Sequence, residues 1–134
     1  MNENDEMPQE SAAEFFERYA QALSTVDLDG LSRCYVYPSL AVSRLGTQAI
    51  TDAKMTREFF EENAVRYQDA GIAAVRIRNL RPCFDDDAVW IGLADLENLD
   101  AQGSHVGTEL NAYQLIVDNG RWAIVVTSPL DAHE

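Results

Sequence analysis

The sequence is poor in the residues that hold disulfides and metals: it contains two cysteines and two histidines among 134 residues. Cys34 and Cys83 form no CxxC pair, and His105 and His133 stand apart from them and from each other. A structural or catalytic zinc or iron site needs several such ligands. We therefore expect no metal, no other cofactor and two reduced thiols.

Positive charge is also scarce. Ten Lys and Arg residues face 23 Asp and Glu residues, which gives a formal net charge of −13. A chain with this charge repels phosphate backbones and anionic lipid headgroups. We therefore expect no nucleic-acid partner and no membrane partner, and we expect ligands or partners that are neutral, cationic or proteins.

Long apolar runs are missing as well. No run approaches the roughly 18 residues that a membrane-spanning helix needs. The N-terminal stretch MNENDEMPQE lacks both the basic and the apolar region of a signal peptide. These features predict a cytoplasmic protein.

The residues that are present are typical of a globular domain, with 46% apolar and 9% aromatic residues. A length of 134 residues suits one domain and is too short for two. We expect residues 1–10 to form a flexible N-terminal arm, residues 11–130 a single domain and residues 131–134 a tail.

The N-terminal half has helical periodicity. Ser11 and Glu14 have the spacing of a capping box, in which each side chain binds an amide of the first helical turn. Apolar residues then recur every three or four positions and predict one amphipathic helix: Ala12, Phe15, Phe16, Tyr19, Leu23 and Val26. Asp27 can cap a second short helix over residues 28–35.

A hairpin and a third helix complete this half. The stretch 39–51 is extended in character, with Leu45-Gly46 at its bend. Thr51-Asp52 can cap a helix over residues 53–70, and Gly71 lies where a helix C-cap is expected.

After Gly71 the pattern becomes extended. Four strands are predicted, over residues 72–84, 88–99, 104–117 and 121–130. The connections between them are too short for crossover helices, so the strands must form an antiparallel meander. Helices followed by a sheet make this an α+β domain.

This order of elements, with particular residues, resembles the nuclear transport factor 2-like superfamily, which includes ketosteroid isomerases and SnoaL-like polyketide cyclases. The resemblance covers residues 11–130. Three stretches show the resemblance: F-x-x-x-Y-A-x-A-L-x-x-x-D-L-D-G-L from Phe15 to Leu31, the pair Phe59-Phe60, and DNGRWAI from Asp118 to Ile124.

The resemblance implies a cystatin-like α+β barrel: a cone-shaped, curved antiparallel sheet that wraps around three N-terminal helices. The helices of such a fold leave the wide end of the cone unfilled, so a small-molecule pocket is expected there. Members commonly pair through the outer face of the sheet, which implies a homodimer.

The resemblance also allows the catalytic residues of ketosteroid isomerases to be tested one by one. Tyr19 aligns with their oxyanion-binding tyrosine, and Asn111 lies near the position of their oxyanion-binding acid. Ser43 falls where their proton-shuttling carboxylate would be, and serine is a poor base at neutral pH. Ketosteroid isomerase activity is therefore disfavoured, and the sequence leaves open whether Tyr19 lines a pocket or only packs in the core.

Another carboxylate could replace the missing base. Asp95 and Glu97 lie late in their strand, and Glu109 shares strand parity with Asn111 and Tyr113, which makes Glu109 the best candidate. The alternative is that all three acids are solvated at strand ends.

The candidate ligand-binding residues are therefore Tyr19, Ser43, Phe59, Trp90, Asn111 and Tyr113. A pocket that binds a neutral or apolar metabolite is the first functional hypothesis. The second is a cyclase, isomerase or dehydratase that uses a pocket carboxylate, and the third is a dimerisation or interaction domain without a ligand.

Overall fold

The computed structural model describes residues 9–130, so His133, the tail at 131–134 and most of the arm lie outside the described residues. The helices are α1 (Ala12–Thr25), α2 (Leu28–Arg33) and α3 (Ala53–Asp69). The strands are β1 (Tyr35–Ser43), β2 (Gly46–Ile50), β3 (Ala74–Asp85), β4 (Val89–Leu99), β5 (His105–Asp118) and β6 (Arg121–Leu130). No helix of the described part is long and apolar enough to span a bilayer.

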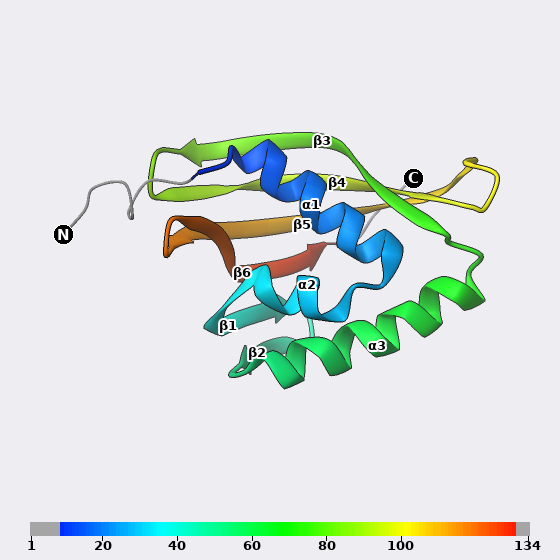
Figure 1. Ribbon diagram of the computed structural model, residues 1–134, viewed down its shortest axis with the longest axis horizontal. Helices are drawn as coiled ribbons and strands as arrows, with labels where there is room; N and C mark the ends of the chain where they lie inside the picture. Colours follow the sequence, from blue (N-terminus) through cyan, green and yellow to red (C-terminus); the bar gives the residue numbers. More distant parts are fainter. Residues whose placement is uncertain (1–8, 131–134) are drawn as a thin grey trace.

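The strands form one six-stranded sheet in the order β2-β1-β6-β5-β4-β3. The predicted meander is confirmed, because β3, β4, β5 and β6 pair antiparallel in sequence order. β1 pairs parallel with β6 and antiparallel with β2, so the hairpin extends the sheet beyond the meander. In Figure 1, α1 crosses the β3–β5 part of the sheet, whereas α2 and α3 lie beside β1 and β2. The predicted α+β class with a cystatin-like fold is confirmed.

Helix α1 begins as the sequence predicts. Ser11 Oγ accepts from the Glu14 amide at 3.1 Å, and Glu14 Oε1 accepts from the Ser11 amide at 2.8 Å, which completes the capping box. The apolar stripe of α1 is buried against the sheet, with Phe15 and Phe16 both fully inaccessible to solvent. Phe16 packs edge-on against the rings of Trp90 and Tyr113 at centroid distances of 5.1 and 5.3 Å. This contact joins α1 to the middle of the sheet.

Helix α3 is held at both ends but is less buried than α1. Asp52 Oδ1 accepts from the Met55 amide at 3.0 Å, as expected for an N-cap. The chain leaves the helix through Gly71 at φ +76°, a conformation that glycine adopts without steric cost. Only Thr56 and Phe60 of α3 are buried. Helix α3 therefore borders the core without filling the space beside it.

Alternation along β5 sorts its side chains between two faces, as the sequence predicts. Tyr113 and Leu115 are 3% and 0% exposed and pack in the core. Glu109 and Asn111 have the same parity, so they project from this inner face further along the strand. The side chains of the other parity, such as Gln114, lie on the outer face.

The second helix is shorter than the sequence predicts. It ends at Arg33 rather than at residue 35, and Tyr35 is already the first residue of β1. The Cys34 carbonyl accepts from the Ile124 amide at 2.8 Å, and Tyr35 then pairs with Ile124. Pairing with the distant strand β6 thus overrides the local helical pattern, because Tyr35 and Val36 are good strand formers.

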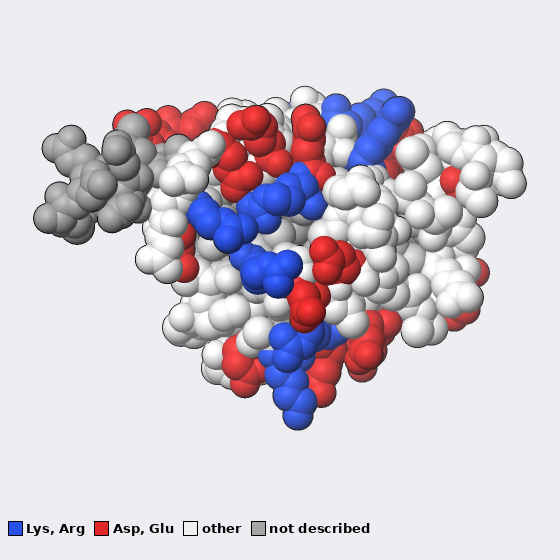
Figure 2. Space-filling model, viewed as in Figure 1, with Lys and Arg blue, Asp and Glu red and all other residues white. Residues whose placement is uncertain are grey.

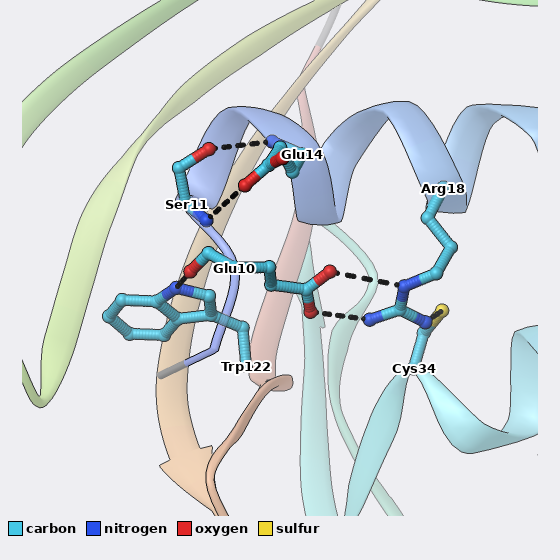
Figure 3. Close-up of polar contacts among 6 residues, drawn as sticks. All are labelled: Glu10, Ser11, Glu14, Arg18, Cys34 and Trp122. Atoms are coloured by element: carbon cyan, nitrogen blue, oxygen red, sulfur yellow. Dashed lines mark hydrogen bonds and ion pairs between the residues drawn. The ribbon is translucent and has the colours of Figure 1, made fainter. Parts of the chain in front are cut away.

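The segment that enters α1 is fixed to the rest of the domain (Figure 3). The Trp122 indole N–H donates to the Glu10 carbonyl at 3.1 Å. The Arg18 guanidinium makes two contacts with the Glu10 carboxylate, at 2.8 and 3.3 Å, and its third nitrogen lies 3.6 Å from the Cys34 sulfur. Glu10, which the sequence assigns to the N-terminal arm, is thus bonded to both α1 and β6.

We predict that Arg18→Met lowers the free energy of unfolding by about 1 kcal/mol. A bidentate ion pair that is partly shielded from solvent stabilises the folded state more than an exposed ion pair does. Arg18 and Glu10 are 36% and 21% exposed at their side chains. Lys54→Met is the matched control, since Lys54 and Glu58 are 4.0 Å apart and 75% and 60% exposed. Urea denaturation of both variants measures the difference, and equal losses would contradict the prediction.

Candidate functional site

A cavity of about 810 Å³ opens between the inner face of the sheet, the β1–β2 hairpin and α3. Helix α1 contributes Tyr19 and Leu23 to its wall, and α3 contributes Phe59, Phe60 and Tyr67. The sheet contributes the inward-facing side chains near the ends of β5 and β6. The cavity exists because α1 covers one end of the sheet and the sparsely buried α3 closes the other only in part.

Three buried phenols form the deep wall of the cavity. The hydroxyls of Tyr19 and Tyr35 are 3.1 Å apart and hydrogen-bonded, and the Asn111 amide nitrogen donates to the Tyr113 hydroxyl at 3.1 Å. Tyr19, Tyr35 and Tyr113 are 3%, 8% and 3% exposed. The rings of Tyr19 and Tyr113 lie 6.0 Å apart, so the two hydrogen-bonded pairs are neighbours. Tyr19 is therefore at once a core residue and a residue of the cavity wall.

The three phenols and Asn111 carry more hydrogen-bond donors than they use among themselves. Three phenols carry three protons, and a chain of three hydroxyls uses at most two of them internally. Asn111 adds a donated hydrogen bond at the Tyr113 end and keeps a second N–H. Tyr19, Tyr35, Asn111 and Tyr113 all line the cavity. The deep wall therefore favours an oxygen that accepts hydrogen bonds.

Burial keeps these phenols neutral. Burial raises the pKa of Tyr113 to about 12, partly offset by the hydrogen bond from Asn111. Burial also raises the pKa of Tyr19 and of Tyr35 well above the usual value for tyrosine. At neutral pH the phenols can therefore donate hydrogen bonds but cannot serve as bases.

Glu109 supplies the acidic group of the cavity. The Tyr67 hydroxyl donates to Glu109 Oε2 at 2.5 Å, and both side chains line the cavity. Burial and the adjacent Glu109 carboxylate raise the pKa of Tyr67. Glu109 is the one acidic side chain among the described residues that line the cavity.

The other two candidate bases lie elsewhere. Asp95 accepts from Arg81 at 3.0 Å, and Glu97 accepts from Arg76 at 2.6 Å and contacts His105 Nδ1 at 2.9 Å. Hydrogen bonds from His105 and Arg76 lower the pKa of Glu97. Neither acid lines the cavity, so both act in ion pairs between strands.

Most of the side chains that the sequence singles out meet at this cavity. Tyr19, Ser43, Phe59, Asn111 and Tyr113 line it together with Glu109. Ser43 lies at the rim in the hairpin, where its hydroxyl accepts from the Leu45 amide at 3.2 Å. Their roles in binding a ligand stay predictions.

Trp90 does not line the cavity. Its indole is 2% exposed and packs against Phe16 at the opposite end of the inner face. A Cβ added to Gly92 would come within 2.8 Å of a Trp90 ring carbon, so the ring lies over its own strand. Trp90 is therefore a core residue.

Sequence reasoning missed several side chains of the cavity: Tyr35, Arg44, Arg66 and Tyr67. Tyr67 belongs to the apolar stripe of the predicted third helix, eight positions after Phe59, and this spacing is the signal that could have found it. The two arginines carry no such signal, because exposed arginines are common on helices and turns.

The described residues hold no group of three or more side chains suited to a metal ion. Cys34 is buried and Cys83 exposed, and both are free thiols. Burial raises the pKa of the Cys34 thiol to about 11, so it is protonated at neutral pH.

The outer face of the sheet carries a row of partly exposed side chains, three of them apolar and one polar. Leu40, Val126, Gln114 and Ile91 are neighbours across four adjacent strands. Leu40 and Ile91 are 41% and 37% exposed. Homodimer formation through this face stays a prediction.

The comparison with known families agrees with this architecture. Residues 6–132 match the family model described as NTF2-like protein (DUF6841). The chain belongs to this NTF2-like family. No match is found among curated proteins.

Solved structures share the NTF2-like fold at low sequence identity. Rv3472 of Mycobacterium tuberculosis, a protein of unknown function, is 17% identical with a TM-score of 0.68, over 90% of this chain and 69% of that one. Aln2 from a Streptomyces species is 15% identical with a TM-score of 0.68, over 90% and 87%. A Nostoc punctiforme protein of unknown function with a cystatin-like fold is 13% identical with a TM-score of 0.66, over 87% and 84%. At these identities the likeness establishes the fold alone.

We predict that this NTF2-like protein loses stability as the pH rises above about 10. The unfolded chain then releases phenolic protons that the folded chain retains, since folding raises the pKa of the buried tyrosines. Each such tyrosine contributes a slope of about 1.4 kcal/mol per pH unit. Tyr35→Phe should remove one such slope in urea denaturation between pH 10 and 12. Titration of all tyrosines near pH 10 without loss of structure would contradict this.

Proposed function

We propose that this NTF2-like protein binds a small apolar metabolite in the cavity, with an oxygen of the ligand accepting hydrogen bonds at the deep wall. The single observation that carries the proposal is the surplus of donors on Tyr19, Tyr35, Asn111 and Tyr113 inside an open cavity. These groups already have partners in the protein, and a ligand oxygen gains binding energy by accepting the protons that those partners do not use.

The shape and composition of the wall support an aromatic or otherwise flat apolar ligand. Four rings line the cavity, those of Tyr19, Phe59, Phe60 and Tyr67, and Phe59 is 55% exposed. Rings of this kind contribute binding energy by edge-on or offset contact with another ring. A cavity of about 810 Å³ falls in the size range of small-molecule sites.

Catalysis by Glu109 is the second candidate function. A carboxylate on the cavity wall with a tyrosine hydroxyl bonded to it could remove a proton next to a carbonyl that the deep donors hold. Ser43 at the rim offers no base, so any such chemistry of the cyclase, isomerase or dehydratase kind depends on Glu109. We place binding first because it requires only the donors and the apolar wall.

Ligand binding can be tested with two probes of equal shape. 2-Acetonaphthone carries a ketone oxygen, and 2-isopropenylnaphthalene replaces that oxygen with a methylene group. Asn111→Leu should weaken binding of the ketone about three- to tenfold and leave the hydrocarbon unchanged, because one hydrogen bond is worth about 1 kcal/mol. Naphthalene fluorescence measures both dissociation constants.

Gln114→Leu is the matched control, since Gln114 lies on the same strand and pairs with Ile91 on the outer face. It should leave both constants unchanged. An equal effect of the two substitutions would remove Asn111 from the site, and the absence of binding by both probes would contradict the proposal.

The catalytic candidate makes a different prediction with the ketone. Base catalysis should speed the exchange of its methyl protons with deuterated water, and Glu109→Gln should abolish the acceleration while binding persists. Proton NMR follows the exchange. Exchange at the uncatalysed rate with bound ketone would leave binding as the function.

A further inference from the structure

Glu109 lies in a different environment from the acids of the protein surface. Figure 2 shows acidic side chains beside basic ones over the helical face of the molecule. Acids in such positions are solvated and need no ligand to stabilise them. Glu109 is half-buried on the inner face of β5 and lines the cavity. A carboxylate that is partly withdrawn from water depends on hydrogen-bond donors around it.

The described neighbours of Glu109 provide few such donors. Leu96 lies directly across from it on β4, is 2% exposed and also lines the cavity. Tyr67 of α3 is the one described residue whose side chain donates to the carboxylate, and it bonds Oε2. No residue in the described part of the chain donates to Oε1. Because a carboxylate can accept about four hydrogen bonds, Glu109 keeps acceptor capacity beside the cavity.

Glu109 and the donors of the deep wall project from the same face of one strand. Glu109 and Asn111 are two residues apart on β5, so their Cα atoms are about 6.6 Å apart. The Asn111 amide in turn donates to the Tyr113 hydroxyl. Burial raises the pKa of Tyr113, and the charge of Glu109 adds to this rise, which agrees with a carboxylate close to the phenols. The cavity therefore has an acceptor and a group of donors at a spacing that a ligand of one or two rings can span.

We infer that the ligand carries a hydroxyl group in addition to its acceptor oxygen, and that Glu109 accepts a hydrogen bond from this hydroxyl. The inference rests on the proposed function and narrows its ligand class to ring compounds that carry both groups. Glu109 is then a specificity residue, because its carboxylate binds O–H and repels an oxygen without a proton. This role requires no proton to leave the ligand.

Matched ketones test the inference. The 6-hydroxy and 7-hydroxy derivatives of 2-acetonaphthone carry a ketone and a hydroxyl on two rings, and the 6-methyl and 7-methyl derivatives replace the hydroxyl with a methyl group. At least one hydroxy ketone should bind the wild-type protein about tenfold more tightly than its methyl counterpart, because a hydrogen bond to a charged acceptor is a strong one. Naphthalene fluorescence near neutral pH, where the naphthol keeps its proton, gives the dissociation constants.

Three substitutions in the cavity assign the preference to a side chain. Glu109→Met should abolish it and keep the affinity for the methyl ketone, because methionine has a similar length and no charged acceptor. Glu109→Gln should reduce it, since a neutral amide oxygen accepts more weakly than a carboxylate. Tyr67→Phe should increase it, because the carboxylate then lacks its described donor within the protein.

Glu62→Met is the matched control. Glu62 is an exposed acid of α3 that does not line the cavity, so the substitution removes the same charge outside the site. It should leave the preference for the hydroxy ketone unchanged. Thermal unfolding of each variant, together with its affinity for the methyl ketone, checks that the variant is folded.

The possible failures differ from one another. Equal binding of hydroxy and methyl ketones to the wild-type protein, or a preference that survives Glu109→Met, would overturn the inference and leave the proposed function intact. Loss of the preference in Tyr67→Phe would overturn it too, because the tyrosine would then be the group that accepts from the ligand. Loss in Glu62→Met would also overturn it, because the effect would then be long-range. Binding of none of the ketones would overturn both the inference and the proposed function.

Discussion

The hydrogen bond between the buried hydroxyls of Tyr19 and Tyr35 is the interaction on which the site depends. Phenols can enter a core only when their hydroxyls find partners. Here they find one another, next to Tyr113 and Asn111, at the boundary between the packed core and the cavity. The same groups therefore complete the core on one side and offer donors to a ligand on the other.

The geometry of the sheet determines where this boundary falls. Phe16 anchors α1 against Trp90 and Tyr113, so the narrow end of the inner face is filled by side chains. Helix α3 buries only Thr56 and Phe60, so the other end stays open. The pairing of β1 with β6 extends the sheet past the meander and brings the hairpin to the edge of the opening.

Much of this could be predicted from the sequence, for reasons that particular residues show. Strand alternation places Glu109, Asn111 and Tyr113 on one face, because a period of two admits no other arrangement. Alternation does not show at which residue of a strand the packed core ends and the cavity begins. The sequence therefore assigns Trp90 to the pocket, whereas in the structure Phe16 of α1 packs against it. Tyr35, Arg44 and Arg66 meet the cavity through long-range packing and strand pairing, which a local pattern does not contain.

Labelling the five tyrosines with carbon-13 at the phenolic carbon tests the central claim most directly. Tyr37 bonds the Ser32 carbonyl and Thr56 and does not line the cavity, so it is an internal reference. Saturation with 2-acetonaphthone should shift the signals of Tyr19, Tyr35 and Tyr113 and leave that of Tyr37 in place. A bound ketone that leaves those three signals unchanged would contradict the account.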